Sequence, residues 1–124
     1  MIYLDTHIAL WLANAELDKM SKSALEKIRT EEIRISPIIR LEIQYLNEIK
    51  RISSPPDPVI EKLSDTIGLS VCDQEFNSVV SKALEITWTR DPFDRLIVAH
   101  AAIKNDFLIT ADRNIQSNYR FALG

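Results

Sequence analysis

Residues 33–49 of the chain, IRISPIIRLEIQYLNEI, join a short alternating segment to a helical pattern. Residues 33–35 alternate apolar and charged side chains, as a half-buried strand does. Ser36 is a good N-cap and Pro37 suits the first helical position, so we predict a helix from Ser36 to about Ile49. At 100° per residue one side of this helix is apolar. That side carries Ile38, Ile39, Leu41, Ile43, Tyr45, Leu46 and Ile49.

Glu42 falls near the middle of this apolar side, alone among hydrophobic residues. A buried ionised carboxylate is unfavourable unless it is paired, hydrogen-bonded or bound to a cation. Helix capping does not explain an acid in the middle of a helix. Two interpretations remain: a buried salt bridge, for example with an arginine, and a role as a metal ligand. Because buried ion pairs are themselves costly, we favour the metal ligand.

The alternation of short apolar strands with helices continues along the chain. Strands are predicted at residues 2–4, 33–35, 69–72 and 107–110. Helices are predicted at residues 8–14, from Ser21 onwards, at 36–49, at 59–65 behind Asp57 and Pro58, behind Asp73, and from Pro92 to about Asn105. This order predicts an α/β fold with a mostly parallel sheet. The one clear breaker, SSPPDP at residues 53–58, is too short to separate two domains, so we expect a single domain over residues 1–124.

The composition excludes several classes of protein. The chain has 124 residues, 46% of them hydrophobic and 27% charged, and a net charge of −3. It therefore has no basic footprint for nucleic acid, although an acidic site that gathers cations can still handle phosphates. Two glycines are too few for a P-loop or a dinucleotide fingerprint, so we expect no nucleotide cofactor. Cys72 is the only cysteine, and we interpret it as inert packing.

The sequence shows neither a signal peptide nor an apolar run long enough to cross a bilayer. We therefore expect a cytoplasmic protein that has no contact with a membrane.

Carboxylates follow the predicted strands. Asp5 comes directly after the first strand, Asp112 lies just past the last one, and Asp91 and Asp94 open a helix. In open α/β sheets ligands bind beyond the carboxyl ends of the strands. Together with Glu42 these residues form a candidate cluster of four or five acids. Hard cations such as Mg²⁺ and Mn²⁺ take oxygen ligands of this kind.

Each of the four aspartates also has a simpler structural explanation. Asp5 can cap the first helix, and Asp91 before Pro92 is close to an ideal N-cap. Asp94 then falls at the third helical position, where an acid favours the helix dipole. Asp112 can be a turn residue.

Taken together, four segments resemble PIN-domain proteins of the VapC toxin type. They are Asp5-Thr6-His7 with the Leu- and Trp-rich helix that follows, Glu42, DPFDRLIVA at residues 91–99, and TAD at residues 110–112. The resemblance covers the chain from end to end, in the order and spacing of the family, and the DPFDR segment is its most specific part. The chain departs from the family at Thr89-Arg90, where related sequences often carry a histidine before the arginine.

The resemblance implies a three-layer α/β/α sandwich and a metal-dependent endoribonuclease. Its catalytic and metal-binding acids would be Asp5, Glu42, Asp94 and Asp112, with Asp91 as a further candidate metal ligand. The cofactor would be Mg²⁺ or Mn²⁺, with one or two ions. The family also implies an RNA substrate, the role of toxin in a toxin–antitoxin pair, and an antitoxin protein that blocks the acidic pocket. We further expect a homodimer, for which the apolar helix over residues 8–13 is compatible with a buried interface.

Other polar and aromatic residues receive structural interpretations. We expect His7 to make a hydrogen bond at the start of its helix, and His100 to be a packing residue. Trp11 is assigned to the core or an interface rather than to base stacking, and Arg51 to the solvated surface. For Arg95 two roles stay open, a contact with phosphate and a pair with a neighbouring acid.

Two other classes of function were weighed. In a non-catalytic PIN-like RNA- or protein-binding module the acids would cap helices or bind a structural ion. Such a module would be expected to lose some of the four acids, whereas here all four positions are filled. A metal-dependent phosphatase with an aspartyl nucleophile commonly needs a second acid two residues on, and position 7 is histidine.

Overall fold

The computed structural model describes residues 1–124 and has a five-stranded sheet at its centre. The strand order is β3-β2-β1-β4-β5, and every pair of neighbouring strands is parallel. The strands are β1 (Ile2–Leu4), β2 (Ile33–Ile35), β3 (Ser70–Val71), β4 (Phe107–Ile109) and β5 (Ala122–Leu123). The predicted α/β fold with a parallel sheet is therefore confirmed.

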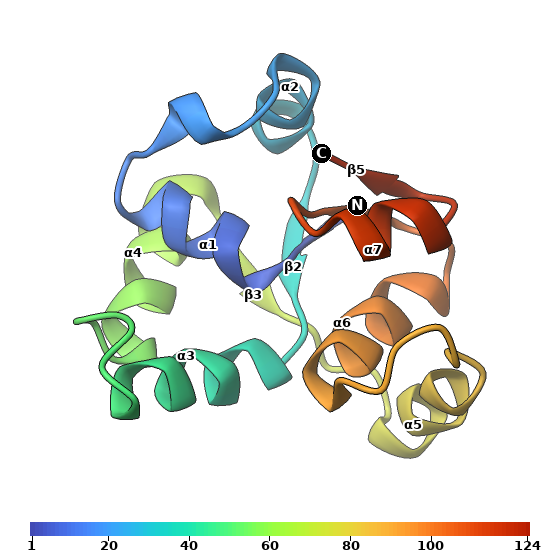
Figure 1. The fold of residues 1–124 in the computed structure, drawn as a ribbon. Helices are drawn as coiled ribbons and strands as arrows, with labels where there is room; N and C mark the ends of the chain where they lie inside the picture. The colour runs from blue at the N-terminus through green and yellow to red at the C-terminus, as the bar shows by residue number, and fades with distance from the viewer.

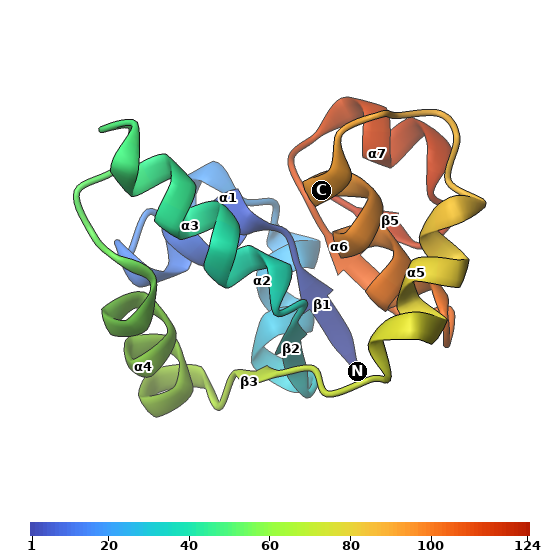
Figure 2. The same ribbon diagram turned by 90° about the horizontal axis from the view of Figure 1, so that it is seen from below.

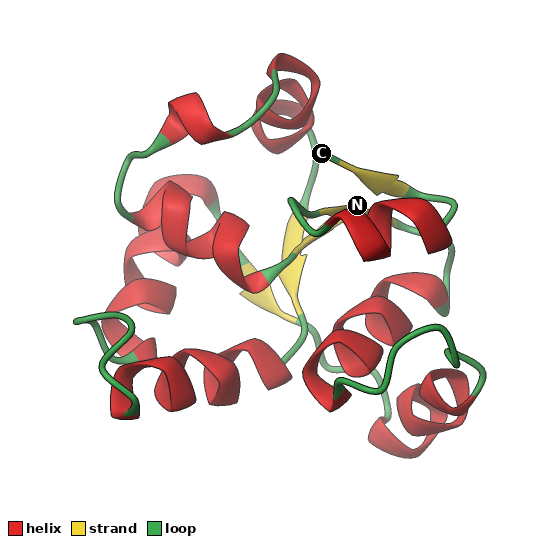
Figure 3. Cartoon of the chain, in the orientation of Figure 1, coloured by secondary structure: helices red, strands yellow, loops and turns green.

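Helices cover both faces of the sheet. They are α1 (Thr6–Ala13), α2 (Lys22–Thr30), α3 (Ile38–Glu48), α4 (Pro56–Ile67), α5 (Phe76–Leu84), α6 (Pro92–Ala102) and α7 (Arg113–Asn118), with a 3₁₀ turn η1 (Leu17–Lys19). Helices α1, α3 and α4 lie on one side of the sheet and α5, α6 and α7 on the other (Figures 1 and 2). Figure 3 shows the strands, in yellow, between these groups of helices. No helix combines the length and the apolar character that crossing a membrane requires.

The central strand β1 determines where the site forms. Its three side chains are fully buried, as expected for a strand covered by helices on both faces. Leu4 pairs with Ile109 of β4, and the Asp5 N–H donates to the Ile109 carbonyl at 2.9 Å. Asp5 and Thr110, the next residues of the two segments, therefore emerge side by side at the carboxyl end of the sheet.

The structure moves several predicted boundaries. Helix α3 begins at Ile38 rather than Ser36, although Ser36 Oγ still accepts a hydrogen bond from the Ile38 N–H at 3.2 Å. Helix α4 begins at Pro56, so the prediction of a start behind Asp57 and Pro58 was wrong. Proline suits the first turn of a helix because its missing N–H would have no partner there.

Helix α5 is capped by Glu75, not by Asp73 as predicted. The Glu75 carboxylate accepts hydrogen bonds from the backbone N–H of Asn77 at 2.8 Å and of Ser78 at 3.2 Å. Asp73 lies three residues before the helix, beyond reach of these groups. Strand β5 and helix α7 were not predicted, because neither contains an apolar run long enough to show a period.

The apolar side of α3 is only partly buried. Ile39 and Ile43 are in the core, whereas Leu41, Tyr45 and Ile49 are 57%, 49% and 44% exposed. The helix contacts α1, α4 and α6, and these neighbours cover only part of its apolar side. The apolar pattern of α3 predicts burial at every one of its positions, and for Leu41, Tyr45 and Ile49 this prediction was wrong. On α5, Phe76 and Leu84 are likewise 64% and 67% exposed.

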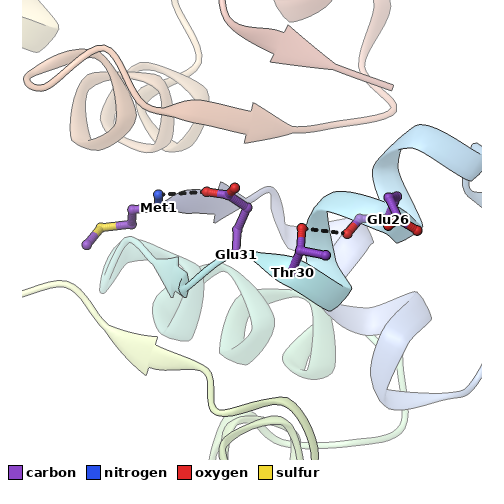
Figure 4. A network of polar contacts seen from close by, with 4 residues as sticks. All are labelled: Met1, Glu26, Thr30 and Glu31. Carbon is purple, nitrogen blue, oxygen red and sulfur yellow. Dashed lines mark hydrogen bonds and ion pairs between the residues drawn. The ribbon is translucent and has the colours of Figure 1, made fainter.

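A polar contact ties the start of β1 to the end of α2 (Figure 4). The Met1 amino group lies 3.0 Å from Glu31 Oε1, and this hydrogen-bonded charge lowers the pKa of the Glu31 carboxyl. In the last turn of α2, Thr30 Oγ1 donates to the Glu26 carbonyl at 3.0 Å. The Met1–Glu31 contact thus links the segment that leads into β2 to the start of β1.

Candidate metal centre

The five acids proposed from the sequence meet in one pocket at the carboxyl end of the sheet. The pocket has a volume of about 330 Å³. Residues from β1–α1, α3, α6 and the β4–α7 connection line it: Asp5, His7, Trp11, Glu42, Asp91, Asp94, Ala111 and Asp112. Segments far apart in sequence thus contribute to one acidic surface.

Asp5 is both a helix cap and a member of the pocket. It is 8% exposed, and its Oδ1 accepts a hydrogen bond from the Thr6 N–H at 2.8 Å. Its other oxygen, Oδ2, accepts from Thr110 Oγ1 at 2.6 Å. Burial raises the pKa of Asp5, and the two hydrogen bonds act in the opposite direction. The sequence offered helix capping and membership of the site as alternative roles for Asp5. In the structure one carboxylate has both roles.

Glu42 points from α3 towards the same site. It is half-buried, and its Oε1 accepts a hydrogen bond from Thr6 Oγ1 at 2.5 Å. None of the ion pairs in the structure includes it, so the salt-bridge interpretation is wrong. Burial raises the pKa of Glu42, and the charges of Asp5 and Asp91 raise it further. The carboxylate has a hydroxyl partner but forms no ion pair with a lysine or arginine.

Asp94 is the most strongly perturbed acid of the group. Burial raises its pKa to about 7, with further contributions from the charges of the other four acids. Asp91 caps α6, where its Oδ1 accepts from the N–H groups of Phe93 at 2.8 Å and Asp94 at 3.3 Å. Asp91 is thus the predicted helix cap and also lines the pocket.

Asp112 caps helix α7 rather than occupying a simple turn. Its Oδ1 accepts from the Ile115 N–H at 3.0 Å. Its own N–H donates to Thr110 Oγ1 at 3.0 Å, and the same hydroxyl donates to Asp5. Thr110 is completely buried and therefore fixes Asp5 and Asp112 relative to each other.

The donor set suits a hard cation. All five candidate ligands are carboxylates, which Mg²⁺ and Mn²⁺ prefer. No three His, Cys, Asp or Glu side chains form a ready-made ligand cage in the structure. Mg²⁺ does not require one, because it is usually held by one or two carboxylates together with waters and substrate phosphates. Burial, with a further contribution from neighbouring acids, raises the pKa values of Asp5, Glu42 and Asp94, and a bound cation would favour their charged forms.

Two residues of α1 line the pocket in addition to the five acids. His7 is exposed and lines the acidic pocket instead of making a hydrogen bond at the helix start. Trp11 packs against the core, as predicted, but it is only half-buried and also lines the pocket, with its ring centroid 6.4 Å from that of His7. Their spacing of four residues on α1, immediately after Asp5, was the available signal, because such residues share one helix face.

Three other residues have structural roles. Arg95 contacts neither an acid nor the pocket: its Nε and Nη2 donate to the Ala83 carbonyl at 3.2 and 3.0 Å, in the last turn of α5. His100 is buried, with Nδ1 3.0 Å from the Leu96 carbonyl. Cys72 is buried and accepts a hydrogen bond from the Tyr3 hydroxyl at 3.1 Å, which confirms its predicted packing role.

Comparison with known proteins identifies the class to which this fold and acidic pocket belong. A sequence model of the PIN domain matches residues 2–121, and the chain therefore belongs to the PIN domain family. Among curated proteins it is similar to ribonuclease VapC22 of Mycobacterium tuberculosis, with 29% identity over 123 residues. That alignment covers 94% of this chain and 91% of the relative.

Solved structures share the fold at lower identity. One is VapBC2 from Rickettsia felis bound to a DNA fragment from its promoter, with a TM-score of 0.66 and 22% identity over 99% of this chain and 98% of that chain. Another is a toxin–antitoxin complex from Klebsiella pneumoniae, with a TM-score of 0.68 and 16% identity over 100% and 97% of the two chains. The predicted PIN-like, three-layer architecture agrees with both.

Proposed function

We propose that the protein is a Mg²⁺- or Mn²⁺-dependent endoribonuclease that hydrolyses phosphodiester bonds of RNA. The observation that carries this proposal is the pocket of five carboxylates around Asp94, whose lining residues include no lysine or arginine. The similarity to a protein named as a ribonuclease supports it independently. In a non-catalytic module whose acids only cap helices, we would not expect five carboxylates to share one pocket.

The residues divide into ligands and groups that orient them. Asp5, Glu42, Asp94 and Asp112 are the proposed ligands and catalytic acids, and Asp91 on the pocket rim is a further ligand. When bound, Mg²⁺ or Mn²⁺ supplies Lewis-acid activation of the phosphodiester and of the attacking water. The buried hydroxyls of two threonines fix the carboxylates before any ion arrives; they are Thr6, which donates to Glu42, and Thr110, which donates to Asp5.

The test is cleavage of labelled single-stranded RNA with Mg²⁺ or Mn²⁺, with and without EDTA. We expect cleavage that requires the metal and is lost in Asp5→Asn and Glu42→Gln. Matched controls are Asp65→Asn and Glu61→Gln, which make the same chemical changes at exposed positions of α4. Cleavage that survives EDTA, or full activity in both pocket variants, contradicts the catalytic assignment and favours a non-catalytic binding module.

We further propose that the protein is the toxin of a toxin–antitoxin pair acting in the cytoplasm. Two structures of the same fold are described as a VapBC assembly and a toxin–antitoxin complex. The antitoxin would cover the acidic pocket, whose charge suits an arginine side chain. A short upstream reading frame whose product inhibits RNA cleavage is the expected finding. If that product leaves cleavage unchanged at equimolar concentration, the pairing is wrong.

The homodimer stays a prediction, but the structure favours α3 over α1 as its interface. The apolar residues of α1 that suggested an interface are largely in the protein's own core. Helix α3 instead presents three exposed apolar side chains, and one of them, Tyr45, stacks on Phe93 of α6 with centroids 6.1 Å apart. Light scattering of wild type and Leu41→Glu tests a dimer through this helix. A monomeric wild type refutes it.

A further inference from the structure

A second cavity adjoins the acidic pocket. It has a volume of about 510 Å³, within the range of small-ligand sites. His7 and Trp11 line both cavities, so the two meet along one face of α1. The side chains of Leu10, Leu46 and Val59 give the second cavity an apolar lining. A strand of nucleic acid that reached the acids could therefore continue past the indole into this space.

Trp11 forms the boundary between the two cavities. Its ring is half-buried, tilted 56° from the His7 ring, and has Lys19 Nζ 5.6 Å from its centroid. Lys19 also pairs with Glu16, which holds it in place. An indole that borders an open cavity beside a cation is a stacking surface for an unpaired base.

Arg51 also lines the second cavity and is the only Lys or Arg among its lining residues. It takes part in none of the ion pairs of the structure. Its backbone is fixed, because the Arg51 N–H donates to the Leu46 carbonyl at 2.9 Å and Asn47 Nδ2 donates to the Ile52 carbonyl at 3.2 Å. A guanidinium that lines a cavity and is paired with no carboxylate suits a phosphate.

We propose that this cavity is the subsite for the nucleotide next to the cleaved bond of single-stranded RNA: its base stacks on Trp11 and a neighbouring phosphate binds Arg51. The proposal rests on the proposed ribonuclease function, which places the reacting phosphate at the acids. It adds a specificity determinant, because the polar groups of Asn14, Ser53 and Ser54 border the cavity and can contact base edges.

Tryptophan fluorescence tests the subsite without measuring activity. The chain has two tryptophans, so Trp88→Phe leaves Trp11 as the only indole emitter. In an Asp94→Asn background, with Mg²⁺ present, we expect a short single-stranded RNA to quench Trp11 emission. Adding Arg51→Gln should weaken this binding about tenfold and lower the salt dependence of log K by about 0.7. Lys104→Gln, which removes an exposed charge after α6, is the matched control and should leave both values unchanged.

The outcomes separate the subsite from the reaction. If RNA is cleaved but does not quench Trp11, or if Lys104→Gln weakens binding as much as Arg51→Gln, the subsite is refuted while the ribonuclease proposal stands. If Trp11 is quenched but RNA is not cleaved, the ribonuclease proposal fails, and with it the placement next to a cleaved bond, while the cavity stands as a binding site for single-stranded RNA. Quenching by an acidic peptide but not by RNA identifies a protein-binding cavity and overturns the proposal.

Discussion

Replacing Asp94 with asparagine should stabilise the metal-free protein. Asp94 is surrounded by four other acids, and its pKa rises from 3.8 to about 7. One pKa unit corresponds to about 1.4 kcal/mol, so a fully shielded carboxylate would destabilise the fold by about 4 kcal/mol. Because half of Asp94 faces solvent, screening reduces this value. We expect Asp94→Asn to raise the free energy of unfolding by about 2 kcal/mol above neutral pH.

The sign of the pH dependence follows from the same shift. Between pH 3.8 and about 7 the folded protein binds more protons than the unfolded chain. The stability of the wild type in EDTA should therefore fall as the pH rises through this range. Burial acts in the same direction on Asp5 and Glu42, so part of the fall should remain in Asp94→Asn.

Urea unfolding in EDTA at about pH 5 and about pH 8 measures both effects. Asp65→Asn on α4 is the matched control and should change neither value. Adding Mg²⁺ at the higher pH should stabilise the wild type more than Asp94→Asn, because binding to the folded state alone adds to stability. If Asp94→Asn is no more stable than the wild type in EDTA at about pH 8, the charge on Asp94 does not destabilise the metal-free fold. The proposal of a cation at this site would then lose its electrostatic support.

Three further predictions concern the groups that support the site. Thr110→Val should lower metal-dependent RNA cleavage by about tenfold or more, because Asp5 loses its hydroxyl donor, whereas Thr110→Ser should retain most activity in the same assay. Arg95→Leu should destabilise the protein by about 1–3 kcal/mol in urea unfolding, since the Ala83 carbonyl loses both guanidinium donors; equal stability would show that this cap is dispensable. Ile43→Ala should destabilise it by about 2–5 kcal/mol through a cavity under α3, and calorimetry showing less than half of the lower value would place Ile43 outside the core.

The acidic residues were predictable because each has a local signature. Asp5 and Asp112 follow apolar strands, and parallel strands bring such positions to one edge of the sheet whatever the details of packing. Glu42 was detectable because a charge interrupts a helical apolar pattern. The positions of these acids could therefore be inferred without coordinates, whereas their hydroxyl partners could not, since Thr6 and Thr110 lie in unrelated segments that meet only in the fold.

The sequence by itself determined the order of the elements from β1 to β4, the parallel sheet and the set of acids at its carboxyl end. These features depend on hydrophobic periodicity and helix caps, which are properties of neighbouring residues. Only the tertiary structure decided which side chains face the site. It placed His7 and Trp11 in the pocket, turned Arg95 towards the end of α5, and left Leu41 exposed. The physical reason is that burial depends on the elements packed against a helix, and a local pattern does not contain them.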